Sequence, residues 1–250
     1  MNRLQGKVAI VTGAAGGVGE GIARLFVAEG AKVLIADLDA DKAQQVAASL
    51  GAQARSVRCD VSKRADIDAA LKACVDAFGA PDIVVNNAGT THRNQSMLDV
   101  DEATFDRVFA VNVKSIYHMT QAVVPLMKAR KSGCIVNIGS TAGIRPRPGL
   151  SWYNASKGAV NVLSKSMAAE LGADGIRVNA VCPVMGATGL IEQFLGTADT
   201  PEARAKIIAG IPLGRMSTPE DVAEAALYLA SDGACFITGV ELPVDGGRTI

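Results

Sequence analysis

Short apolar runs rich in β-branched residues alternate along this chain with longer stretches in which apolar residues recur at helical spacing. The apolar runs predict strands over residues 7–11, 32–36, 54–59, 82–85, 134–138, 177–181 and 239–244. The helically spaced stretches predict helices over residues 18–29, 41–50, 67–78, 101–130, 153–171 and 219–230. Strands that are apolar on both faces and joined by helices are typical of parallel sheets with right-handed crossovers. The pattern therefore predicts an α/β fold, in which residues 1–250 form one domain with a doubly wound parallel sheet and helices on both faces.

One long segment, residues 184–210, departs from this regular pattern. It contains Gly186, Gly189, Gly196 and Pro201. Long irregular segments inside compact domains are often lids or binding loops. We therefore expect residues 184–210 to form a flexible substrate lid.

The composition excludes several classes of protein. With 250 residues, 49% of them hydrophobic and 20% charged, the chain buries one substantial core, which excludes intrinsic disorder. The 25 basic residues balance the 25 acidic ones, whereas a protein that binds nucleic acid normally carries a basic excess. The sequence has no apolar run of about 18 residues, and residues 1–7 lack the apolar stretch of a secretory signal. We therefore expect neither a nucleic-acid partner nor a membrane span.

The five cysteines lie far apart, and no two have the Cys-x-x-Cys spacing of a metal knuckle or a redox pair. The chain has only two histidines, so a His-based metal site is not expected. Isolated cysteines beside apolar runs are typical of small core residues in a reducing compartment. The interpretation is a cytoplasmic protein without a bound metal.

A glycine-rich turn follows the first predicted strand and opens a helix. Its sequence is Thr12-Gly13-Ala14-Ala15-Gly16-Gly17-Val18-Gly19. Glycines at such a turn allow backbone N–H groups to approach a pyrophosphate at the positive end of a helix. The spacing is Gly-x-x-x-Gly-x-Gly, a variant of the usual dinucleotide fingerprint, and a tight turn without a ligand is the alternative. The position between strand and helix favours dinucleotide binding.

An acidic residue, Asp37, ends the second strand 18 residues after Gly19. A carboxylate at this place binds the ribose hydroxyls of an adenosine and repels a 2′-phosphate, which favours NAD over NADP. The alternative for Asp37 is a solvated strand-end carboxylate or a helix cap. Asp60, after the third strand, is placed to reach the adenine, and its alternative is an N-cap for the next helix.

Polar residues end the next two strands. The run Asn86-Asn87-Ala88-Gly89 closes the fourth strand, and Ser140 follows the fifth, at the edge where open α/β sheets bind ligands. Tyr153 and Lys157 are four residues apart in a helical stretch, so they share one face. Hydride transfer between a carbinol carbon and a nicotinamide also requires a proton to move on or off the oxygen. A tyrosine is a poor base at neutral pH unless nearby positive charge lowers its pKa. The Lys157 ammonium and an oxidised nicotinamide ring would together supply that charge.

The chain resembles the classical short-chain dehydrogenase/reductase family over essentially its full length. The motifs that carry the resemblance are Thr12-Gly13-x-x-x-Gly17-x-Gly19, Asp60, Asn86-Asn87-Ala88-Gly89, Asn112, Ser140, Tyr153-x-x-x-Lys157 and Val244-Asp245-Gly246-Gly247. The Tyr-x-x-x-Lys pair alone is common, but an ordered set at the family's spacing is not. The resemblance implies a Rossmann-type fold and oxidoreductase activity with a nicotinamide cofactor.

The resemblance also implies roles for individual residues. Tyr153 is the acid/base, Ser140 orients the carbonyl or carbinol, Lys157 tunes Tyr153, and Asn112 anchors a proton-relay water. Without the resemblance, we would interpret Asn112 as a polar residue in the middle of a helix that faces solvent. The implied cofactor-binding residues are Gly13, Gly17, Val18, Gly19, Asp37, Asp60, Val61, Asn87, Ala88, Gly89, Tyr153, Lys157, Pro183 and Thr188.

The chain departs from the family pattern at Val184. The family usually has Pro-Gly after the sixth strand, beside the nicotinamide, whereas this chain has Pro183-Val184. A β-branched side chain there puts the nicotinamide contact and the start of the lid in question.

Local residues give hints about the substrate. Arg145 and Arg147 lie between Ser140 and Tyr153, where two guanidinium groups suit a carboxylate or phosphate. The alternative is a solvated loop or an ion pair across a subunit contact. Trp152 is interpreted as lining the cleft or packing in an interface, and His92 and Asn94 are further candidates for substrate contact.

Three hypotheses follow. The first is an NAD-dependent dehydrogenase or reductase of a small secondary alcohol or ketone. The second is a 3-oxoacyl-[acyl-carrier-protein] reductase, whose carrier docks on basic residues near Lys128, Arg130 and Lys131. The alternative for these cations is that they complement a helix dipole. The third is a regulator that senses NAD without chemistry, although such proteins typically lose the tyrosine or lysine.

The resemblance further implies a homotetramer. Its interfaces would use the helix that contains Asn112, the helix that contains Tyr153, and the final strand.

Overall fold

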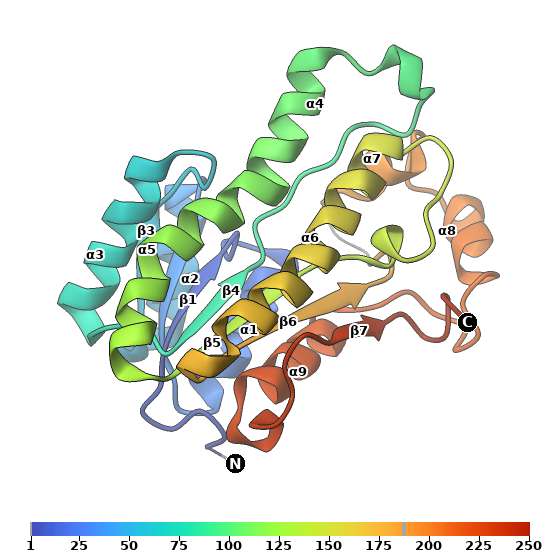
Figure 1. The fold of residues 1–250 in the computed structure, drawn as a ribbon. Coiled ribbons are helices and arrows are strands. Elements are labelled where there is room, and N and C mark those ends of the chain that lie inside the picture. The colour runs from blue at the N-terminus through green and yellow to red at the C-terminus, as the bar shows by residue number, and fades with distance from the viewer. Residues whose placement is uncertain (1, 187–188) are drawn as a thin grey trace.

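The computed structural model describes residues 2–186 and 189–250 of the chain, and Figure 1 shows their arrangement. A parallel sheet of seven strands runs through its centre, in the order β3-β2-β1-β4-β5-β6-β7. The strands are β1 Val8–Thr12, β2 Lys32–Asp37, β3 Ala54–Arg58, β4 Ile83–Asn86, β5 Gly133–Ile138, β6 Ile176–Pro183 and β7 Glu241–Val244. The predicted fold class, a doubly wound parallel α/β sheet of Rossmann type, is confirmed.

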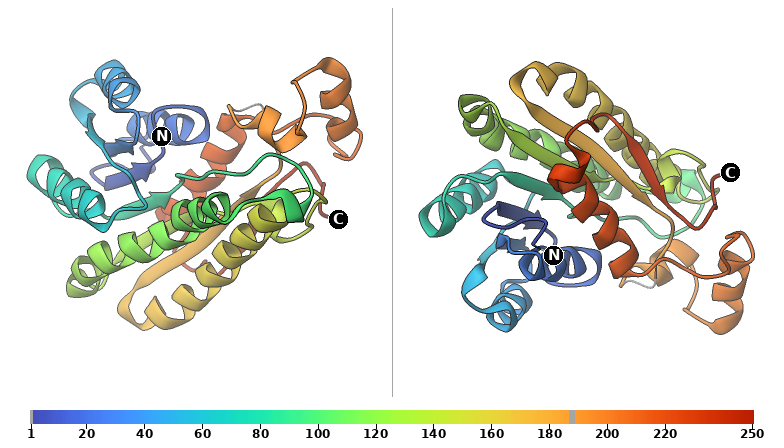
Figure 2. Two further views of the ribbon diagram at one scale, coloured as in Figure 1. Left: turned by 90° about the horizontal axis from the view of Figure 1, so that it is seen from above. Right: turned by 90° about the horizontal axis from the view of Figure 1, so that it is seen from below.

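Helices cover both faces of the sheet, as the two views of Figure 2 show. One face is covered by α1 Gly17–Ala28, α2 Ala40–Leu50 and α9 Pro219–Ala230, and the other by α3 Arg64–Phe78, α5 Ser115–Arg130 and α6 Ser151–Leu171. Successive strand residues point to opposite faces, so Val11 packs into the core beneath α1 and Ile10 into the core beneath α3 and α5. Burial on both faces explains why the strands are apolar at nearly every position.

The order of the strands creates an opening at one edge of the sheet. β1 pairs with β2 on one side and with β4 on the other, with Ala9 opposite Val33 and Ile83 respectively. The chain thus runs outward from β1 to β3 and then returns to β4. β1 leads to α1 on one face of the sheet and β4 leads to α5 on the other, and ligands of open α/β sheets bind at such a switch point.

The predicted helix over residues 101–130 is not continuous. It is divided into α4 Glu102–Phe109, a π-helical turn over Ala110–Lys114, and α5. A π-helical turn accommodates one extra residue, and such turns are frequent at functional sites. Hydrophobic spacing did not reveal this turn, because one inserted residue disturbs the helical period only slightly.

The segment over residues 184–210 is less irregular than expected. It contains two short helices, α7 Ile191–Leu195 and α8 Pro201–Ile208, which lie beyond the carboxyl ends of the strands (Figure 1). The Thr200 hydroxyl accepts a hydrogen bond from the Ala203 N–H, and Pro201 occupies the first turn of α8. The proline, interpreted as a mark of irregular structure, therefore begins a helix.

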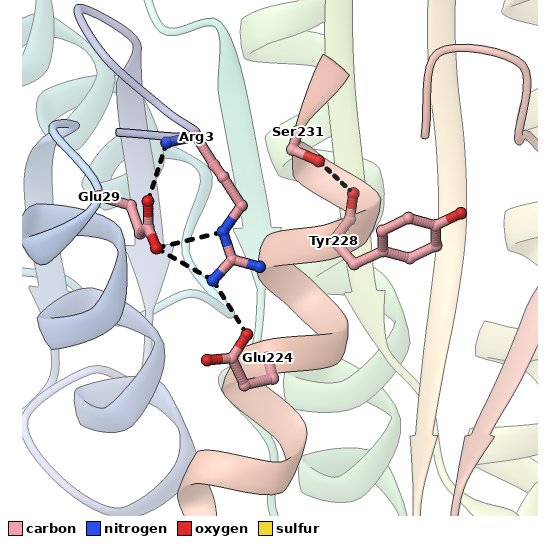
Figure 3. Close-up of polar contacts among 5 residues, drawn as sticks. All are labelled: Arg3, Glu29, Glu224, Tyr228 and Ser231. Atoms are coloured by element: carbon pink, nitrogen blue, oxygen red, sulfur yellow. Dashed lines mark hydrogen bonds and ion pairs between the residues drawn. The ribbon is translucent and has the colours of Figure 1, made fainter. Parts of the chain in front are cut away.

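At the opposite edge, Arg3 connects the N-terminal segment to two helices of one layer (Figure 3). Its N–H and guanidinium donate to the Glu29 carboxylate at 2.8–3.1 Å, and its Nη2 also lies 3.1 Å from Oε2 of Glu224 on α9. These hydrogen bonds lower the pKa of Glu29 to about 2. Arg3 therefore ties the end of α1 to α9, far from the switch point.

Candidate active site

A cavity of about 1600 Å³ lies at the carboxyl ends of the strands. Its wall is formed by the glycine-rich turn, the ends of β2, β4, β5 and β6, the start of α6, and the helices α7 and α8. The predicted catalytic residues Ser140, Tyr153 and Lys157 lie in the same wall as Gly17 and Asp37. The topology thus brings together residues that are more than a hundred positions apart.

The glycine-rich turn is shaped by close approaches that leave no room for a side chain. Gly13 has a φ of +63°, and a Cβ added to it would lie 2.8 Å from the Cα of Ala88. A Cβ on Gly19 would overlap the carbonyl oxygen of Gly13. At Gly16 and Gly17 an added Cβ would meet nothing within 4 Å, so the start of α1 faces open space. The first N–H groups of a helix lack intrahelical partners, so this end of α1 suits a pyrophosphate.

Asn87 holds the turn in this shape from the neighbouring strand. Its Nδ2 donates to the carbonyl oxygens of Thr12 and Gly13, both at 2.9 Å. In return, the Thr12 hydroxyl accepts the N–H groups of Asn87 and Ala88 at 3.1 Å. The side chain of Asn87, expected in a cofactor contact, therefore shapes the cradle, and Ala88 and Gly89 line the cavity beside it.

Asp37 lies at the end of β2, beside the same turn. Its Oδ2 accepts the Ala15 N–H at 2.8 Å and its Oδ1 accepts the Asp39 N–H at 3.0 Å. Lys42, a cation of the cavity wall near this point, is paired with Asp39 at 3.0 Å. The Asp37 carboxylate therefore lies beside the glycine-rich turn, and the nearby Lys42 ammonium already has a carboxylate partner.

Asp60 and Val61 continue the wall from the end of β3. The Asp60 carboxylate accepts the N–H and the hydroxyl of Ser62 at 3.1 and 2.6 Å, and the Ser62 hydroxyl makes the largest contribution to lowering its pKa. The alternative of a helix N-cap is wrong, because Lys63 occupies that position.

The three residues of the reactive group come from two elements. Ser140 follows β5, and its Oγ accepts the Ala142 N–H at 3.0 Å. Tyr153 and Lys157 lie one turn apart in α6, and both are buried. The Tyr153 ring packs edge-on against Phe194 of α7, with 5.0 Å between the ring centroids. Lys157 Nζ donates to the carbonyl oxygen of Ile138 at 2.7 Å.

The pKa of Tyr153 in the protein alone is raised, whereas the lowered pKa expected from the sequence is for a phenol beside both an ammonium and an oxidised nicotinamide ring. Burial raises it to about 12, against the opposing effects of a hydrogen bond with Ser140 and the charge of Arg147. Burial also lowers the pKa of Lys157 to about 8. In the protein alone, the cation that acts on the phenol is therefore Arg147, because the Lys157 amine is directed to the Ile138 carbonyl.

Asn112 lies inside the molecule, in the π-helical turn, with 2% of its surface exposed. Its Oδ1 accepts the Thr90 N–H at 2.8 Å, and its Nδ2 donates to the Thr90 carbonyl and the Ser156 hydroxyl at 2.9 Å. A Cβ on Gly89 would lie 3.5 Å from both Asn112 Oδ1 and Lys157 Nζ, so these two groups flank the same space. The solvent-facing interpretation of Asn112 is wrong.

Val184, the departure from the family pattern, is accommodated. Its side chain is buried, its N–H donates to Val244 at 3.2 Å, and its carbonyl accepts the Ser217 hydroxyl at 3.1 Å. Pro183 and Val184 both line the cavity. Thr188, the expected carboxamide contact, lies outside the described residues.

His92 and Asn94 support the site without lining the cavity. His92 is 2% exposed, with Nδ1 2.8 Å from the Arg93 carbonyl oxygen and Nε2 3.4 Å from the Tyr153 N–H. Asn94 Nδ2 donates to the Phe194 carbonyl at 3.2 Å. His92 therefore packs against the turn of α6 that carries the tyrosine.

Trp152 faces away from the cavity. Its Nε1 donates to the Met97 carbonyl at 3.2 Å, and its ring packs edge-on against Phe105 of α4. Trp152 therefore packs against α4 within the chain and is not among the residues that line the cavity.

The two predicted arginines occupy different environments. Arg145 is exposed and donates to the carbonyl oxygen of Arg248 at 2.8 Å. Arg147 is half-buried, and its Nη2 donates to the Phe194 carbonyl at 3.0 Å. Both arginines line the cavity, together with Arg248 and Phe194, which the sequence did not single out. Neither belongs to a motif, and Arg248 lies about a hundred residues from Tyr153 in sequence.

The cations at the end of α5 are partnered. Lys128 and Lys131 both contact Asp174, at 2.9 and 3.1 Å. Arg130 donates to the carbonyl oxygens of Ala80 and Pro81 at 3.0 and 2.6 Å. These contacts favour a structural role over the docking of an acidic carrier.

Across residues 2–186 and 189–250, no helix has the length and apolar character needed to cross a membrane. The same part of the chain contains no group of three or more histidine, cysteine, aspartate or glutamate residues arranged to hold a metal ion.

Comparison with known proteins places the chain among oxidoreductases. A family model described as Enoyl-(Acyl carrier protein) reductase matches residues 13–249. The chain is 49% identical to 4-formylbenzenesulfonate dehydrogenase of Comamonas testosteroni, with 99% of each chain covered. It is 43% identical to 2-(S)-hydroxypropyl-CoM dehydrogenase 3 of Xanthobacter autotrophicus, over 99% of this chain and 98% of that one. The crystal structure of 3-ketoacyl-(acyl-carrier-protein) reductase from Brucella melitensis, complexed with NADH, superposes with a TM-score of 0.94 at 45% identity, covering 99% of this chain and 100% of the other.

Proposed function

This chain belongs to the classical short-chain dehydrogenase/reductase family and is a nicotinamide-dependent oxidoreductase, and we propose that it interconverts a secondary alcohol and a ketone with Tyr153 as acid/base. The observation that carries the proposal is the position of Ser140, Tyr153 and Lys157 in the wall of the cavity that the glycine-rich turn opens into. A bound nicotinamide dinucleotide supplies the hydride donor or acceptor. The protein must then hold the oxygen and move its proton.

The environment of Tyr153 suits the donation of a proton. Burial keeps the phenol protonated at neutral pH, so it is ready to protonate a carbonyl oxygen during reduction. In the oxidation direction the phenolate must take the carbinol proton, and each unit by which its pKa falls is worth about 1.4 kcal/mol. Ser140 and the positive charge of Arg147 both act in that direction. Ser140 also offers its hydroxyl to the substrate oxygen, and Lys157 offers an ammonium beside the cradle.

We propose NAD as the cofactor, in preference to NADP. The glycine-rich turn, with Val18 in its helix, would hold the pyrophosphate, and Asp37 the adenosine ribose. Asp60 and Val61 would line the adenine site, and Pro183 the nicotinamide site. A carboxylate at Asp37, with Lys42 already paired to Asp39, supports this preference. Isothermal titration with NADH and NADPH measures it, and equal affinities would contradict it.

The test of the proposed reaction is Tyr153→Phe. General acid–base catalysis contributes about 10²–10⁴-fold, so turnover of a ketone panel with NADH should fall by that factor. NADH binding by the variant should stay within about threefold of the wild type, because the phenol oxygen is removed and the ring is kept. Unchanged turnover would remove Tyr153 from the mechanism.

A second candidate is reduction of a 3-oxoacyl group on an acyl carrier protein. The similarity to the Brucella melitensis reductase favours it. The partnered cations at the end of α5 do not. Comparing kcat/KM for a carrier-bound 3-oxoacyl thioester and for free ketones discriminates the two, since the carrier enzyme should prefer the thioester by several orders of magnitude.

We also propose that the protein is a homotetramer in the cytoplasm. Tyr117 on α5, Val162 on α6 and Phe236 near β7 are exposed large apolar side chains on the elements expected at the interfaces. The cysteines in the described residues are all free, which supports a reducing compartment. Sedimentation that gives a monomer would contradict the tetramer.

The segment with α7 and α8 is our proposed substrate lid. Phe194 of α7 packs on the catalytic tyrosine, so movement of α7 would open or close that side of the cavity.

A further inference from the structure

Two guanidinium groups, those of Arg147 and Arg248, line the cavity close to Tyr153. Both side chains are half-buried. A Cβ on Gly210 would lie 3.5 Å from Arg248 Nε, so Arg248 packs against the chain just after α8. Among the described residues, neither arginine has a carboxylate within ion-pair distance, whereas Arg204 and Arg215 each have an aspartate. Arg147 and Arg248 are therefore two half-buried guanidinium groups of the cavity wall that this part of the chain leaves without a carboxylate partner.

The positive charges of Arg147 and Arg248 repel each other. The pKa of Arg147 is lowered, first by burial and then by the positive charge of Arg248. Half-buried charges without counterions are costly, and proteins normally pair them. Within the part of the chain that the structure describes, the Arg147 guanidinium donates one hydrogen bond, to the Phe194 carbonyl, although it carries five N–H donors. The arrangement is that of an anion site whose ligand comes from outside.

The position of Arg147 and Arg248 in the cavity indicates which bound molecule they would contact. Phe194 receives the hydrogen bond from Arg147 through its carbonyl and packs its ring on Tyr153. The charge of Arg147 acts on the Tyr153 phenol, so the guanidinium and the reacting oxygen lie in one compartment. Asp37, by contrast, lies beside the glycine-rich turn, where the adenosine is expected. An anion held by the arginines is therefore part of the substrate.

We propose that Arg147 and Arg248 bind a carboxylate or sulfonate group on the substrate, so that the enzyme acts on anionic alcohols and ketones. This inference rests on the proposed function, because it assumes that Tyr153 reacts with the other end of the same molecule. Arginine suits the role because its planar fork donates two parallel hydrogen bonds to an oxyanion.

Binding measured without chemistry provides the first test. Titration calorimetry on the NAD-loaded protein would use toluene-4-sulfonate and 4-methylbenzoate as unreactive probes. Charge-assisted hydrogen bonds are strong enough that Arg248→Gln should weaken one or both probes about tenfold or more. Arg64→Gln is the matched control, because Arg64 is exposed on α3, is paired with Asp68 and lies outside the cavity wall. Equal affinities in the Arg248 and Arg64 variants, or no binding of either probe, would overturn the proposal.

Substrate selectivity provides the second test. With NADH, 4-acetylbenzenesulfonate and 4-acetylbenzoate would be compared with neutral 4-methylacetophenone. In Arg248→Gln, the ratio of kcat/KM for the preferred anion to that for the neutral ketone should fall about tenfold or more. Substitution of Arg248 gives the clearer result, because the charge of Arg147 also acts on the Tyr153 phenol. An unchanged ratio would overturn the proposal.

The two tests separate failure of this inference from failure of the proposed function. Probe binding that depends on Arg248, in a protein that reduces no ketone, would disprove the reaction and keep the anion site. Ketone reduction that depends on Tyr153 but shows the same selectivity after Arg248→Gln would keep the reaction and disprove the anion site.

Discussion

The phenol of Tyr153 is the residue on which the proposed chemistry depends, and its burial sets the starting state. Eight per cent of Tyr153 is exposed, and its ring is covered by Phe194. An ionised phenol is poorly stabilised there, so the proton stays on the oxygen until positive charge is added or moved closer. In the proposed reaction, Tyr153 is therefore protonated in the protein alone, and it would act as a base only once a bound dinucleotide brings positive charge near the phenol.

This leads to a prediction for the protein without dinucleotide. The ultraviolet difference between wild type and Tyr153→Phe, followed as the pH rises, should show no ionisation of Tyr153 below pH 10, because burial raises its pKa to about 12. In Arg147→Gln the ionisation should move to still higher pH, since a favourable charge is lost. A phenol in the wild type that ionises near pH 8 would contradict the burial argument.

A second prediction at this scale concerns the glycine-rich turn. A Cβ at Gly19 would overlap backbone atoms of the turn, so Gly19→Ala should lower the free energy of unfolding by about 1–3 kcal/mol. Gly16→Ala is the matched control, because its Cβ meets nothing within 4 Å and its φ of −177° is extended backbone. Urea denaturation measures both, and equal losses would show that crowding at Gly19 is not the cause.

At the scale of elements, buried polar side chains fix the position of α6, which carries both Tyr153 and Lys157. Asn86 of β4 donates to Asn137 of β5 at 2.8 Å, and Asn137 donates to Ser164 of α6 at 2.9 Å. Asn112 holds the same helix through Ser156 at 2.9 Å. Buried amides without partners are costly, so these contacts favour one position of the helix on the sheet.

The series of hydrogen bonds that joins β4, β5 and α6 leads to a prediction about the stability of the fold. Ser164→Ala removes the acceptor of the buried Asn137 amide, which should cost about 1–3 kcal/mol in the free energy of unfolding. Ser166→Ala, an exposed serine on the same helix, should change it by less than about 0.5 kcal/mol. Thermal and urea unfolding of the two variants provide the comparison. A Ser164 variant as stable as the Ser166 variant would show that the helix position does not depend on this network.

In the molecule as a whole, the site and the contacts of Arg3 with α1 and α9 lie at opposite ends of the strands. The cavity lies at the carboxyl ends of the strands, and the Arg3 contacts with Glu29 and Glu224 lie at the amino-terminal edge (Figure 3). Acid should therefore loosen one side of the molecule through groups that take no part in catalysis.

The corresponding prediction is a dependence of stability on acid pH. The pKa of Glu29 is lowered from 4.5 to about 2 by its hydrogen bonds with Arg3, so its contribution is full above pH 4.5 and is lost as the pH falls towards 2. Glu29→Gln should flatten the fall in melting temperature between pH 4.5 and 2. Glu224→Gln, whose carboxylate is more exposed, should retain most of the slope. The same slope in wild type and Glu29→Gln would exclude this carboxylate as the cause.

Features that depend on neighbouring residues were predicted from the sequence more completely than features that depend on residues distant along the chain. Strand positions were predicted within a few residues, because burial on both faces makes the strands apolar. The division of the long helix at Asn112 and the short helices of the 184–210 segment were missed, because they depend on local backbone geometry and caps. Arg248 was missed because nothing near it in sequence points to a ligand.

Hydrophobic period and local spacing are properties of neighbouring residues. They were therefore enough to predict the order of strands and helices, the glycine-rich turn and the residue types of the reactive group. Only the tertiary structure decided the direction of the Tyr153 pKa, the internal position of Asn112 and the meeting of Arg147 with Arg248 in one cavity. Burial and charge act through space, and the residues that bury Tyr153 or face Arg147 are distant along the chain.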